Sequence, residues 1–377
     1  MLFLASLCLT MIDGPFVFPP EKKHNHGSCI VELKSGDLFA CWYSGSGERK
    51  ADDVRIEGAV LRKGSDDWSE RFVLVDTPGM PDCNPCMMVA PDGRLWLWWI
   101  TVQDNEWESS LLKYRTASKF DESGRPVWDG GDVLHAIPKS DFQSRVDADC
   151  DIEEKKAQTE LDYYKERRRK ASIKLNQRLG WMTRARPTVA SKGRWILPLY
   201  SDGFDFSIML LSDDEGKSWS PSDPLISRGG VQPSVIERKD GTLVAIMRDN
   251  GPPPQRAMIS ESSDGGETWS PVRDSEIPNP GSGLEWIRLH SGRWALVHND
   301  TEEGRQRLSL WLSDDEGKTW RWKTAIEQDE SGSFSYPSII ETSGGELIVS
   351  YSWSKGGLES IKVARLSENE IVKENRR

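Results

Sequence analysis

Basic residues are fewer than acidic residues in this sequence. Its 377 residues include 49 Lys and Arg against 60 Asp and Glu, which gives a formal net charge of −11 at pH 7. A protein that neutralises nucleic-acid phosphates needs a basic face, and this charge balance argues against one. We therefore expect no nucleic-acid partner.

Long apolar runs and clustered cysteines are also scarce. The N-terminal run MLFLASLCLTM (1–11) has no basic region before it and is too short to span a bilayer. It fits either an unusual export signal or a buried strand, so an exported and a cytoplasmic location both stay open. The six cysteines are scattered, and the C-x-x-C at Cys83 and Cys86 has no second pair to complete a zinc site. We expect buried free thiols and no metal, organic cofactor or membrane span.

Glycine and tryptophan are abundant, with 32 and 17 residues. A polar turn of the form S-x-D-x-G-x-x-W recurs three times, ending at Trp219, Trp269 and Trp320. The Asp and Ser side chains can bond turn amides, Gly can adopt positive φ, and Trp can pack between sheets. The repeat therefore predicts hairpin corners with a structural role.

A second repeat sets the fold. Six turn-then-strand segments contain a glycine at position 36, 93, 193, 241, 292 or 345, with spacings of 57, 100, 48, 51 and 53. About fifty residues is the length of a four-stranded propeller blade. The spacing predicts an all-β, six-bladed β-propeller that occupies residues 1–377 as a single domain. The FVFPP segment at Phe16 is expected to supply the outer strand that closes the ring.

The spacing of 100 indicates an insertion in the second blade. Residues from about 149 to 179 contain no Gly or Pro and are rich in Glu, Lys, Arg, Ala and Leu, which predicts one long helix or a helical pair. We expect the charge run Lys165 to Lys170 to form a solvated helix face.

Polar residues are predicted to ring the central channel, because the innermost strands of all blades begin at the same face. The expected positions are His26, Asn84, Arg186, Gln232, Gly283 to Glu285, and Tyr336. Unpaired polar groups in a buried channel cost free energy, so a polar ring favours a functional site over an inert hub.

With its Asp-box turns and six units, the sequence resembles the sialidase (neuraminidase) superfamily of six-bladed propellers. The resemblance covers nearly the whole chain apart from the helical insertion. It implies arginines that bind a substrate carboxylate, a Tyr nucleophile assisted by a Glu, and an acid/base Asp on a mobile loop.

The motifs of the resemblance suggest roles for particular residues. Tyr336, in FSYPSII, matches the nucleophile, and Arg248, in IMRDN sixteen residues after Gln232, matches a carboxylate-binding arginine. Arg307 is a second such match, with Arg305 as the fallback. The acid/base loop holds Asp52 and Asp53, with Arg49 beside them.

The sequence departs from the family pattern at two positions. His26 replaces the first arginine, and Gln232 replaces the Glu that assists the Tyr. Asp249 and Glu285 are further candidate carboxylates near the channel. Independently of the family, two arginines in one pocket suit a carboxylate or sulfate, and a His can exchange protons near neutral pH.

Three functions follow from these residues. The favoured one is a sialidase-like exo-glycoside hydrolase that acts on a terminal acidic sugar, with Tyr336 attacking and Asp52 or Asp53 protonating the leaving oxygen. The second is a uronate polysaccharide lyase in which Tyr336 and His26 transfer protons and an arginine neutralises the carboxylate. The third is a non-catalytic carbohydrate-binding propeller.

Overall fold

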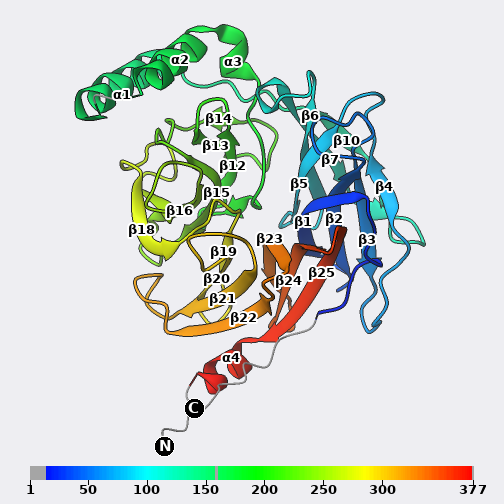
Figure 1. Ribbon diagram of the computed structural model, residues 1–377. Helices are drawn as coiled ribbons and strands as arrows, with labels where there is room; N and C mark the ends of the chain where they lie inside the picture. The colour runs from blue at the N-terminus through cyan, green and yellow to red at the C-terminus, as the bar shows by residue number, and fades with distance from the viewer. Residues whose placement is uncertain (1–13, 158–159, 376–377) are drawn as a thin grey trace, which may run out of the picture.

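The computed structural model describes residues 14–157 and 160–375, and its strands form sheets arranged radially about a common axis (Figure 1). Within these residues there are five four-stranded sheets, one three-stranded sheet and a small two-stranded hairpin. The six-bladed all-β propeller expected from the glycine spacing is therefore confirmed. The N-terminal run 1–11, with Cys8, lies outside the described residues.

The blades follow one another in chain order. Blade 1 contains β1 (His24–Glu32), β2 (Leu38–Gly45), β3 (Arg55–Leu61) and β4 (Phe72–Val75). Blade 2 contains β5 (Asp82–Val89), β6 (Leu95–Val102), β7 (Ser110–Ala117) and β10 (Gly130–Val133), with the 3-10 helix η1 (Trp107–Ser109) before β7 and the hairpin β8 (Lys119–Phe120) and β9 (Pro126–Val127) after it. Blade 3 contains β11 (Thr188–Val189), β12 (Trp195–Ser201), β13 (Phe206–Ser212) and β14 (Ser220–Pro221).

Blades 4 to 6 complete the ring. Blade 4 contains β15 (Gly230–Glu237), β16 (Leu243–Asp249), β17 (Arg256–Ser262) and β18 (Arg273–Pro278). Blade 5 contains β19 (Glu285–Arg288), β20 (Trp294–His298), β21 (Arg307–Ser313) and β22 (Trp322–Gln328). Blade 6 contains β23 (Gly332–Glu341), β24 (Glu346–Lys355) and β25 (Leu358–Ser367), after which α4 (Glu368–Glu374) ends the described chain.

The N-terminal segment closes the ring as the sequence predicted. It runs antiparallel to β25, with bridges from Phe16 to Lys362 and from Glu21 to Glu359. The Val17 N–H donates to the carbonyl of Ile361 at 2.8 Å. Blade 6 thus takes its outermost strand from the other end of the chain, which ties the two ends of the ring together.

The three Asp-box turns have the same hydrogen bonds and join the third and fourth strands of blades 3, 4 and 5. In the first, the Ser212 hydroxyl donates to Asp214, and the N–H groups of Gly216 and Ser218 donate to Ser212 and Asp214, all at 2.8 Å. Trp219 closes the turn and packs edge-on against Trp98 of blade 2, with ring centroids 6.4 Å apart. The predicted structural role of the turn is confirmed.

Apolar side chains fill the spaces between neighbouring blades. Ile246 and Ile236 of blade 4 pack with Leu296 of blade 5, and Val349 of blade 6 packs with Val297 of blade 5. The cysteines within the described residues are free and buried, as expected: Cys29, Cys41, Cys83, Cys86 and Cys150. The core therefore holds the blades together and leaves the axis to polar residues.

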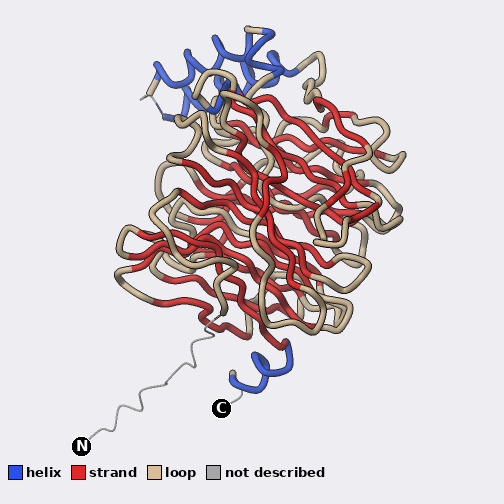
Figure 2. The backbone as a smooth tube through the Cα atoms, turned by 90° about the vertical axis from the view of Figure 1, so that its right-hand side faces the viewer, coloured by secondary structure: helices blue, strands red, loops and turns tan. Residues whose placement is uncertain are grey.

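The helical insertion forms α1 (Phe142–Ala157), α2 (Leu161–Ser172) and α3 (Lys174–Arg178) between the last strand of blade 2 and the first of blade 3. It lies along one edge of the ring, opposite α4 (Figures 1 and 2). The helices begin earlier than position 149 because Asp141 precedes the first turn and its carboxylate accepts from Arg145 at 2.6 Å. Phe142, at the start of α1, is buried against Phe204 with ring centroids 5.2 Å apart.

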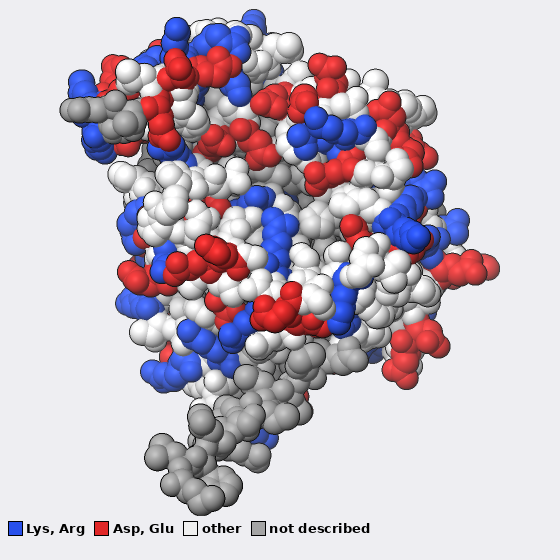
Figure 3. Space-filling view, viewed as in Figure 1, with Lys and Arg blue, Asp and Glu red and all other residues white. Residues whose placement is uncertain are grey.

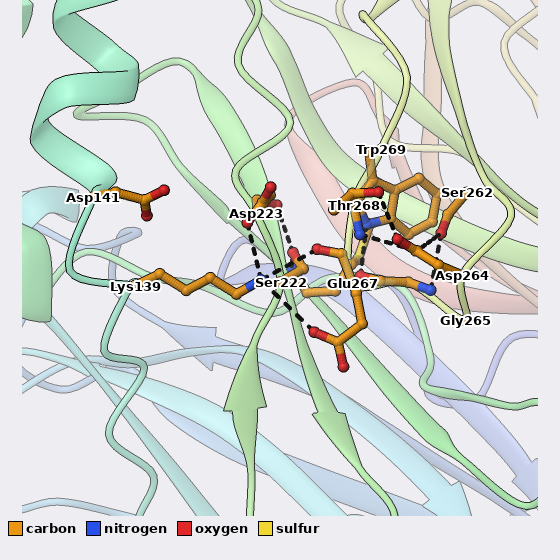
Figure 4. Close-up of polar contacts among 12 residues, drawn as sticks. Lys139, Asp141, Ser222, Asp223, Ser262, Asp264, Gly265, Glu267, Thr268 and Trp269 are labelled. Carbon is orange, nitrogen blue, oxygen red and sulfur yellow. Dashed lines mark hydrogen bonds and ion pairs between the residues drawn. The ribbon is translucent and has the colours of Figure 1, made fainter.

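Ion pairs fasten the start of the insertion to two blades. The Lys139 ammonium lies 2.9 Å from the Asp223 carboxylate of blade 3 and 3.7 Å from that of Glu267, in the Asp-box of blade 4 (Figure 4). Arg145 adds a second cation, 3.0 Å from Asp223. Because one carboxylate holds two cations and the Asp223 N–H also donates to the Glu267 carbonyl, these contacts form a network rather than an isolated pair.

Arg167 overturns part of the expectation for the charge run Lys165 to Lys170. Its side chain is only 3% exposed, and it donates hydrogen bonds to the carbonyls of Phe204, at 2.7 Å, and Ser227. Its guanidinium also lies 5.0 Å from the centre of the Phe206 ring. The run was predicted to form a solvated helix face, but helix packing turns this one arginine toward the propeller, where backbone carbonyls replace water.

The molecular surface carries both signs of charge. In the view of Figure 3, acidic and basic side chains alternate over the blades and over the helical insertion. None of the helices within 14–157 and 160–375 has both the length and the apolar character needed to cross a bilayer.

Replacing Arg167 by Met should loosen the insertion, because two buried carbonyls would lose charge-assisted donors, at a cost of about 2 to 4 kcal/mol. The expected result is faster hydrogen exchange and faster proteolysis in α2, with the propeller strands still protected. Arg168→Met is the matched control, because Arg168 pairs within the insertion, with Glu154 and Asp151. Equal protection of α2 in the Arg167 variant and the wild type would contradict this role.

Candidate active site

One face of the propeller collects the chemically active side chains. In each antiparallel blade the innermost strand begins at this face, and the loop between the second and third strands returns to it. The loops at 46–54, 103–109, 202–205 and 299–306 therefore surround the starts of the innermost strands. The Asp-box turns lie on the opposite face.

A repeated backbone irregularity marks where the innermost strands begin. The strand pairing shifts register at His26/Cys29, Cys83/Cys86, Val231/Ser234 and Ser335/Ser338. At these bulges Gly27, Asn84, Gln232 and Tyr336 have φ of 65°, 51°, 54° and 53°. Side chains other than glycine rarely adopt this left-handed conformation, and it clusters at functional sites. Tyr336, Gln232 and Asn84 share this position in different blades.

Three blades contribute polar side chains to the space around Gly283. A Cβ atom built on Gly283 would lie 3.1 Å from Gln232 Oε1, 3.3 Å from Tyr336 Cδ1 and 3.4 Å from Arg184 Nε. Gln232 and Arg184 are each 4% exposed, and among the described residues Gln232 Oε1 and Arg184 Nε have no hydrogen-bond partner. Buried polar atoms left without a protein partner suit a polar ligand or water.

The Tyr336 hydroxyl lies in a positive environment. It accepts a hydrogen bond from Arg248 Nη1 at 2.8 Å, and the guanidinium carbons of Arg184 and Arg305 lie 5.0 and 5.3 Å from the centre of its ring. Burial by itself raises the pKa of Tyr336, but the charges of Arg248 and Arg305 outweigh it, so the pKa lies below its ordinary value. The phenolate form is therefore more accessible than in a free tyrosine.

His26 packs edge-on against the Tyr336 ring, with centroids 4.3 Å apart. Burial lowers the pKa of His26, and the neighbouring His24, Arg305, Arg184 and Arg248 lower it further, to well below its usual value. The imidazole is therefore neutral near pH 7 and able to accept a proton.

The buried phenol of Tyr200 holds the side-chain amides of Asn84 and Gln232 in place. The Tyr200 hydroxyl accepts from Asn84 Nδ2 at 3.0 Å and from Gln232 Nε2 at 3.2 Å. Tyr200 is 3% exposed, and burial raises its pKa well above the ordinary value, so it remains a neutral phenol. This network fixes the side chain of Gln232 beside Tyr336.

Two carboxyl groups other than Asp52 and Asp53 act on the pocket electrostatically. Burial raises the pKa of Asp202 to about 6, although the positive charge of Arg248 opposes the shift. Glu48 accepts a hydrogen bond from the Tyr43 hydroxyl at 2.8 Å, and its charge opposes ionisation of Tyr336. A carboxyl group that titrates near pH 6 can still hold a proton under mildly acidic conditions, which suits a general acid. Within the described residues, no group of three or more His, Cys, Asp or Glu side chains is arranged to hold a metal ion.

Comparison with known proteins identifies the family. The BNR repeat-like domain family matches residues 36–349. The chain belongs to that family. Sialidase-like proteins are among its relatives: the anhydrosialidase of Macrobdella decora is 26% identical over 214 residues, covering 49% of this chain and 27% of the relative. The sialidase of Paraclostridium sordellii is 26% identical over 148 residues, covering 34% and 35%. The matched region is thus less than two thirds of either relative.

Solved structures share the fold of this BNR repeat-like protein. A Dyadobacter fermentans protein of unknown function superposes with a TM-score of 0.72 at 16% identity, covering 95% of this chain and 99% of the other. The leech intramolecular trans-sialidase, complexed with 2,7-anhydro-Neu5Ac, gives 0.70 at 14% identity, covering 97% and 71%. The Streptococcus pneumoniae NanB sialidase gives 0.69 at 12% identity, covering 96% and 71%. These likenesses show a sialidase-like propeller fold.

The structure separates the sequence-predicted arginines of this BNR repeat-like protein. Arg248 reaches Tyr336, but Arg307 pairs with Asp300 at 3.2 Å, and its fallback Arg305 lies over the Tyr336 ring instead. Arg186 pairs with Glu285 at 3.1 Å.

The remaining predicted residues lie at the same face, Arg49, Asp52 and Asp53 in a loop and Asp249 at the end of β16. Asp53 accepts from the Ser46 N–H at 2.9 Å and from its hydroxyl at 2.8 Å, which closes the 46–54 loop. Asp52 accepts from Asn105 at 3.0 Å. Arg49 lies 3.5 Å from Glu106, and Asp249 accepts from the N–H groups of Gly251 and Arg256. Asp53 and Asp249 thus bind loop backbone.

The functional candidates that sequence reasoning missed are Arg184 and Asp202. Arg184 lies nine residues before the turn glycine Gly193, the same spacing that separates Tyr336 from Gly345. The proline after Arg186 points to Arg186 as the residue at the channel. The nine-residue spacing to the turn glycine points to Arg184, which is the residue that contacts Tyr336. Asp202 follows β12 directly, and nothing in its local sequence distinguishes it from other loop aspartates.

The ionisation of Tyr336 should depend on Arg248. A difference titration between the wild type and Tyr336→Phe, followed by ultraviolet absorbance, should show a phenol that ionises below its ordinary pKa. Arg248→Gln should move this ionisation to higher pH, because the cation favouring the phenolate is removed. Arg307→Gln is the matched control and should leave it unchanged. An unshifted titration in the Arg248 variant would rule out the electrostatic coupling.

Proposed function

We propose that this protein is an exo-acting glycoside hydrolase that removes a terminal acidic sugar from glycans. One observation carries the proposal: the Tyr336 hydroxyl accepts from Arg248 at 2.8 Å in a pocket that also contains Arg184 and Arg305. Tyrosine nucleophiles are an exception to the usual pair of carboxylates in glycosidases. A tyrosine whose pKa is lowered by neighbouring arginines supports that chemistry.

Arg248 and Arg305 are the arginines suited to the acidic group of the substrate. Both are only partly buried at the site face, whereas Arg184 is buried and donates to the carbonyls of Pro337, at 3.0 Å, and Ser28. Each charge-assisted hydrogen bond to a carboxylate contributes about 1.5 to 3 kcal/mol. Arg184 instead positions the Tyr336 ring and adds positive charge beneath it.

The reaction would proceed in two steps through Tyr336. In the first, the phenolate oxygen bonds to the anomeric carbon while the glycosidic bond breaks, and a proton reaches the leaving oxygen. In the second, water attacks the same carbon, the group that protonated the leaving oxygen takes a proton from that water, and Tyr336 leaves as a phenolate. At the position where the sialidase resemblance implies a Glu, Gln232 cannot take the tyrosine proton, so in this proposal the arginines provide the activation by lowering the pKa of Tyr336.

Asp202 is the better-supported proton donor for the first step. Its carboxyl has a pKa of about 6, so it can hold a proton in mildly acidic solution, and it interacts electrostatically with Arg248. Asp52 remains the second candidate, because it lies on the loop that the sialidase resemblance assigns to the acid/base. The sialidase and anhydrosialidase relatives support an acidic-sugar substrate.

Tyr336→Phe should abolish turnover of a sialoside, uronide or sulfated oligosaccharide that the wild type cleaves, because the ring remains and the reactive oxygen is lost. Arg248→Ala should weaken binding of the same substrate to Tyr336→Phe protein by more than about tenfold. Arg307→Ala is the control and should bind nearly as the parent does. Full activity of Tyr336→Phe would refute the proposal, and binding without any wild-type turnover would favour a carbohydrate-binding propeller.

A uronate lyase is the second candidate, because His26 supports it. A neutral imidazole lies edge-on to Tyr336 with centroids 4.3 Å apart, and such a pair could remove a proton and return one while Arg248 neutralises the uronate carboxylate. A lyase leaves an unsaturated product that absorbs in the ultraviolet, whereas a hydrolase leaves a reducing sugar without that absorbance.

Two variants separate these reactions. For a hydrolase, Asp202→Asn should slow cleavage of a sugar leaving group more than that of an aryl leaving group, which needs less protonation, and His26→Ala should mainly raise KM. For a lyase, His26→Ala should reduce the rate by about 100-fold or more. The measurement is kcat and KM for both substrates, with product absorbance recorded in parallel. An Asp202→Asn effect equal for both leaving groups would contradict its role as the acid.

A further inference from the structure

We propose that a cavity between the helical insertion and blades 2 and 3 binds the sugar unit on the leaving-group side of the cleaved bond. The inference deepens the proposed function and rests on it, because it names the part of the substrate that this chain selects. The cavity has a volume of about 320 Å³. Its polar lining comes from Glu106, Glu108, Arg169, Lys170 and Asn176, and its apolar lining comes from Leu179 and Phe204.

The cavity adjoins the Tyr336 pocket through Asp202. Ser201 and Gly203, on either side of Asp202, line the cavity. Asp202 interacts electrostatically with Glu108, which also lines the cavity, and with Arg248, which donates to the Tyr336 hydroxyl at 2.8 Å. The end of β12 therefore links the two spaces: Tyr200 accepts a hydrogen bond from Gln232 beside Tyr336, and Asp202 lies in the chain between two residues that line the cavity, where the proposed reaction needs a proton donor.

The geometry of an exo-acting enzyme determines the direction in which the rest of the glycan leaves the site. The terminal sugar occupies the pocket at the axis, so the rest of the glycan must extend outward past the loops of the same face. The 202–205 loop, the 103–109 loop and the insertion form one side of that exit. A sugar unit leaving past Asp202 reaches this cavity first.

The lining has the mixed chemistry that sugars require. Small-molecule sites have volumes of roughly 300 to 1,000 Å³ and combine apolar walls with a few polar groups. The half-buried Asn176 side chain has no hydrogen-bond partner among the described residues and can donate and accept, while the half-buried Leu179 offers apolar surface to a sugar face.

The insertion is held rigidly enough to select a ligand. Lys170 of α2 donates to the Gly203 carbonyl at 3.2 Å and lies 3.4 Å from the Glu108 carboxylate. Arg167, one turn earlier, is anchored on the Phe204 carbonyl. The insertion therefore contributes a fixed wall beside the site.

The test compares two substrates that share the terminal sugar: 3′-sialyllactose and 4-methylumbelliferyl sialoside. Asn176→Ala should raise KM for sialyllactose by about three- to tenfold, the equivalent of one hydrogen bond, and leave the aryl substrate within twofold. Asn176→Trp, which fills the cavity, should reduce kcat/KM for sialyllactose by more than about tenfold. Leu175→Ala is the matched control, because Leu175 lies on α3 and is 63% exposed. Equal effects on both substrates, or none on either, would overturn the inference.

A binding arm distinguishes failure of the inference from failure of the proposed function. Saturation-transfer NMR with free lactose on Tyr336→Phe protein should detect binding, and the additional Asn176→Trp substitution should remove it. Lactose binding that survives this substitution would refute the sugar site whatever the catalytic result. Loss of binding in a protein that cleaves neither substrate would support the cavity as a sugar site and count against the hydrolase.

Discussion

The site depends on one backbone constraint, the bulge at the start of the innermost strands. At this point the chain adopts a left-handed conformation in blades 1, 2, 4 and 6, and in three of them the residue is not glycine. The bulge turns Asn84, Gln232 and Tyr336 out of the regular strand pattern. Gln232 and Tyr336 meet near Gly283, and Asn84 reaches Gln232 through the Tyr200 hydroxyl. Blades bury their apolar faces against one another whether or not these bulges exist. The bulges thus serve the site more than the fold.

The charges around the site determine the protonation of its side chains. Gln232 cannot act as a base, and the buried Tyr200 phenol holds it in place by a hydrogen bond of 3.2 Å. Positive charge compensates for the missing carboxylate, because Arg248 and Arg305 lower the pKa of Tyr336 against the opposing effect of burial. Burial, with His24 and the same cations, lowers the pKa of His26 and keeps its imidazole neutral. The positive charge around Tyr336 thus favours the phenolate while the adjacent imidazole stays neutral, so the proposed hydrolase and the alternative lyase would use the same residues.

The helical insertion adds a feature that the six-fold repeat does not contain. Lys139 ties its start to the carboxylates of Asp223 and Glu267, while Arg167 and Lys170 tie α2 to the carbonyls of the 202–205 loop. The Lys139 contacts hold the start of the insertion. The Arg167 and Lys170 contacts hold α2 beside Asp202. An element attached to the outer edge of the ring can thus influence the active face without disturbing the pseudo-symmetric core.

The sequence by itself determined the repeat and the features of the fold that follow from its period. Turn glycines about fifty residues apart, Asp-boxes and a stretch without Gly or Pro were enough to predict six blades, closure by the segment at Phe16, and helices after blade 2. The same periodicity pointed to Tyr336 and Gln232 at the axis. Only the tertiary structure decided which charged side chains join them. Arg305 and Arg307 lie two residues apart. Which of them faces Tyr336 depends on how the loop packs and on the ion pair between Arg307 and Asp300. Asp202 acquires its raised pKa from burial and from the nearby carboxylates of Asp205 and Glu108, against the opposing charge of Arg248, and no local sequence signal encodes an environment of that kind.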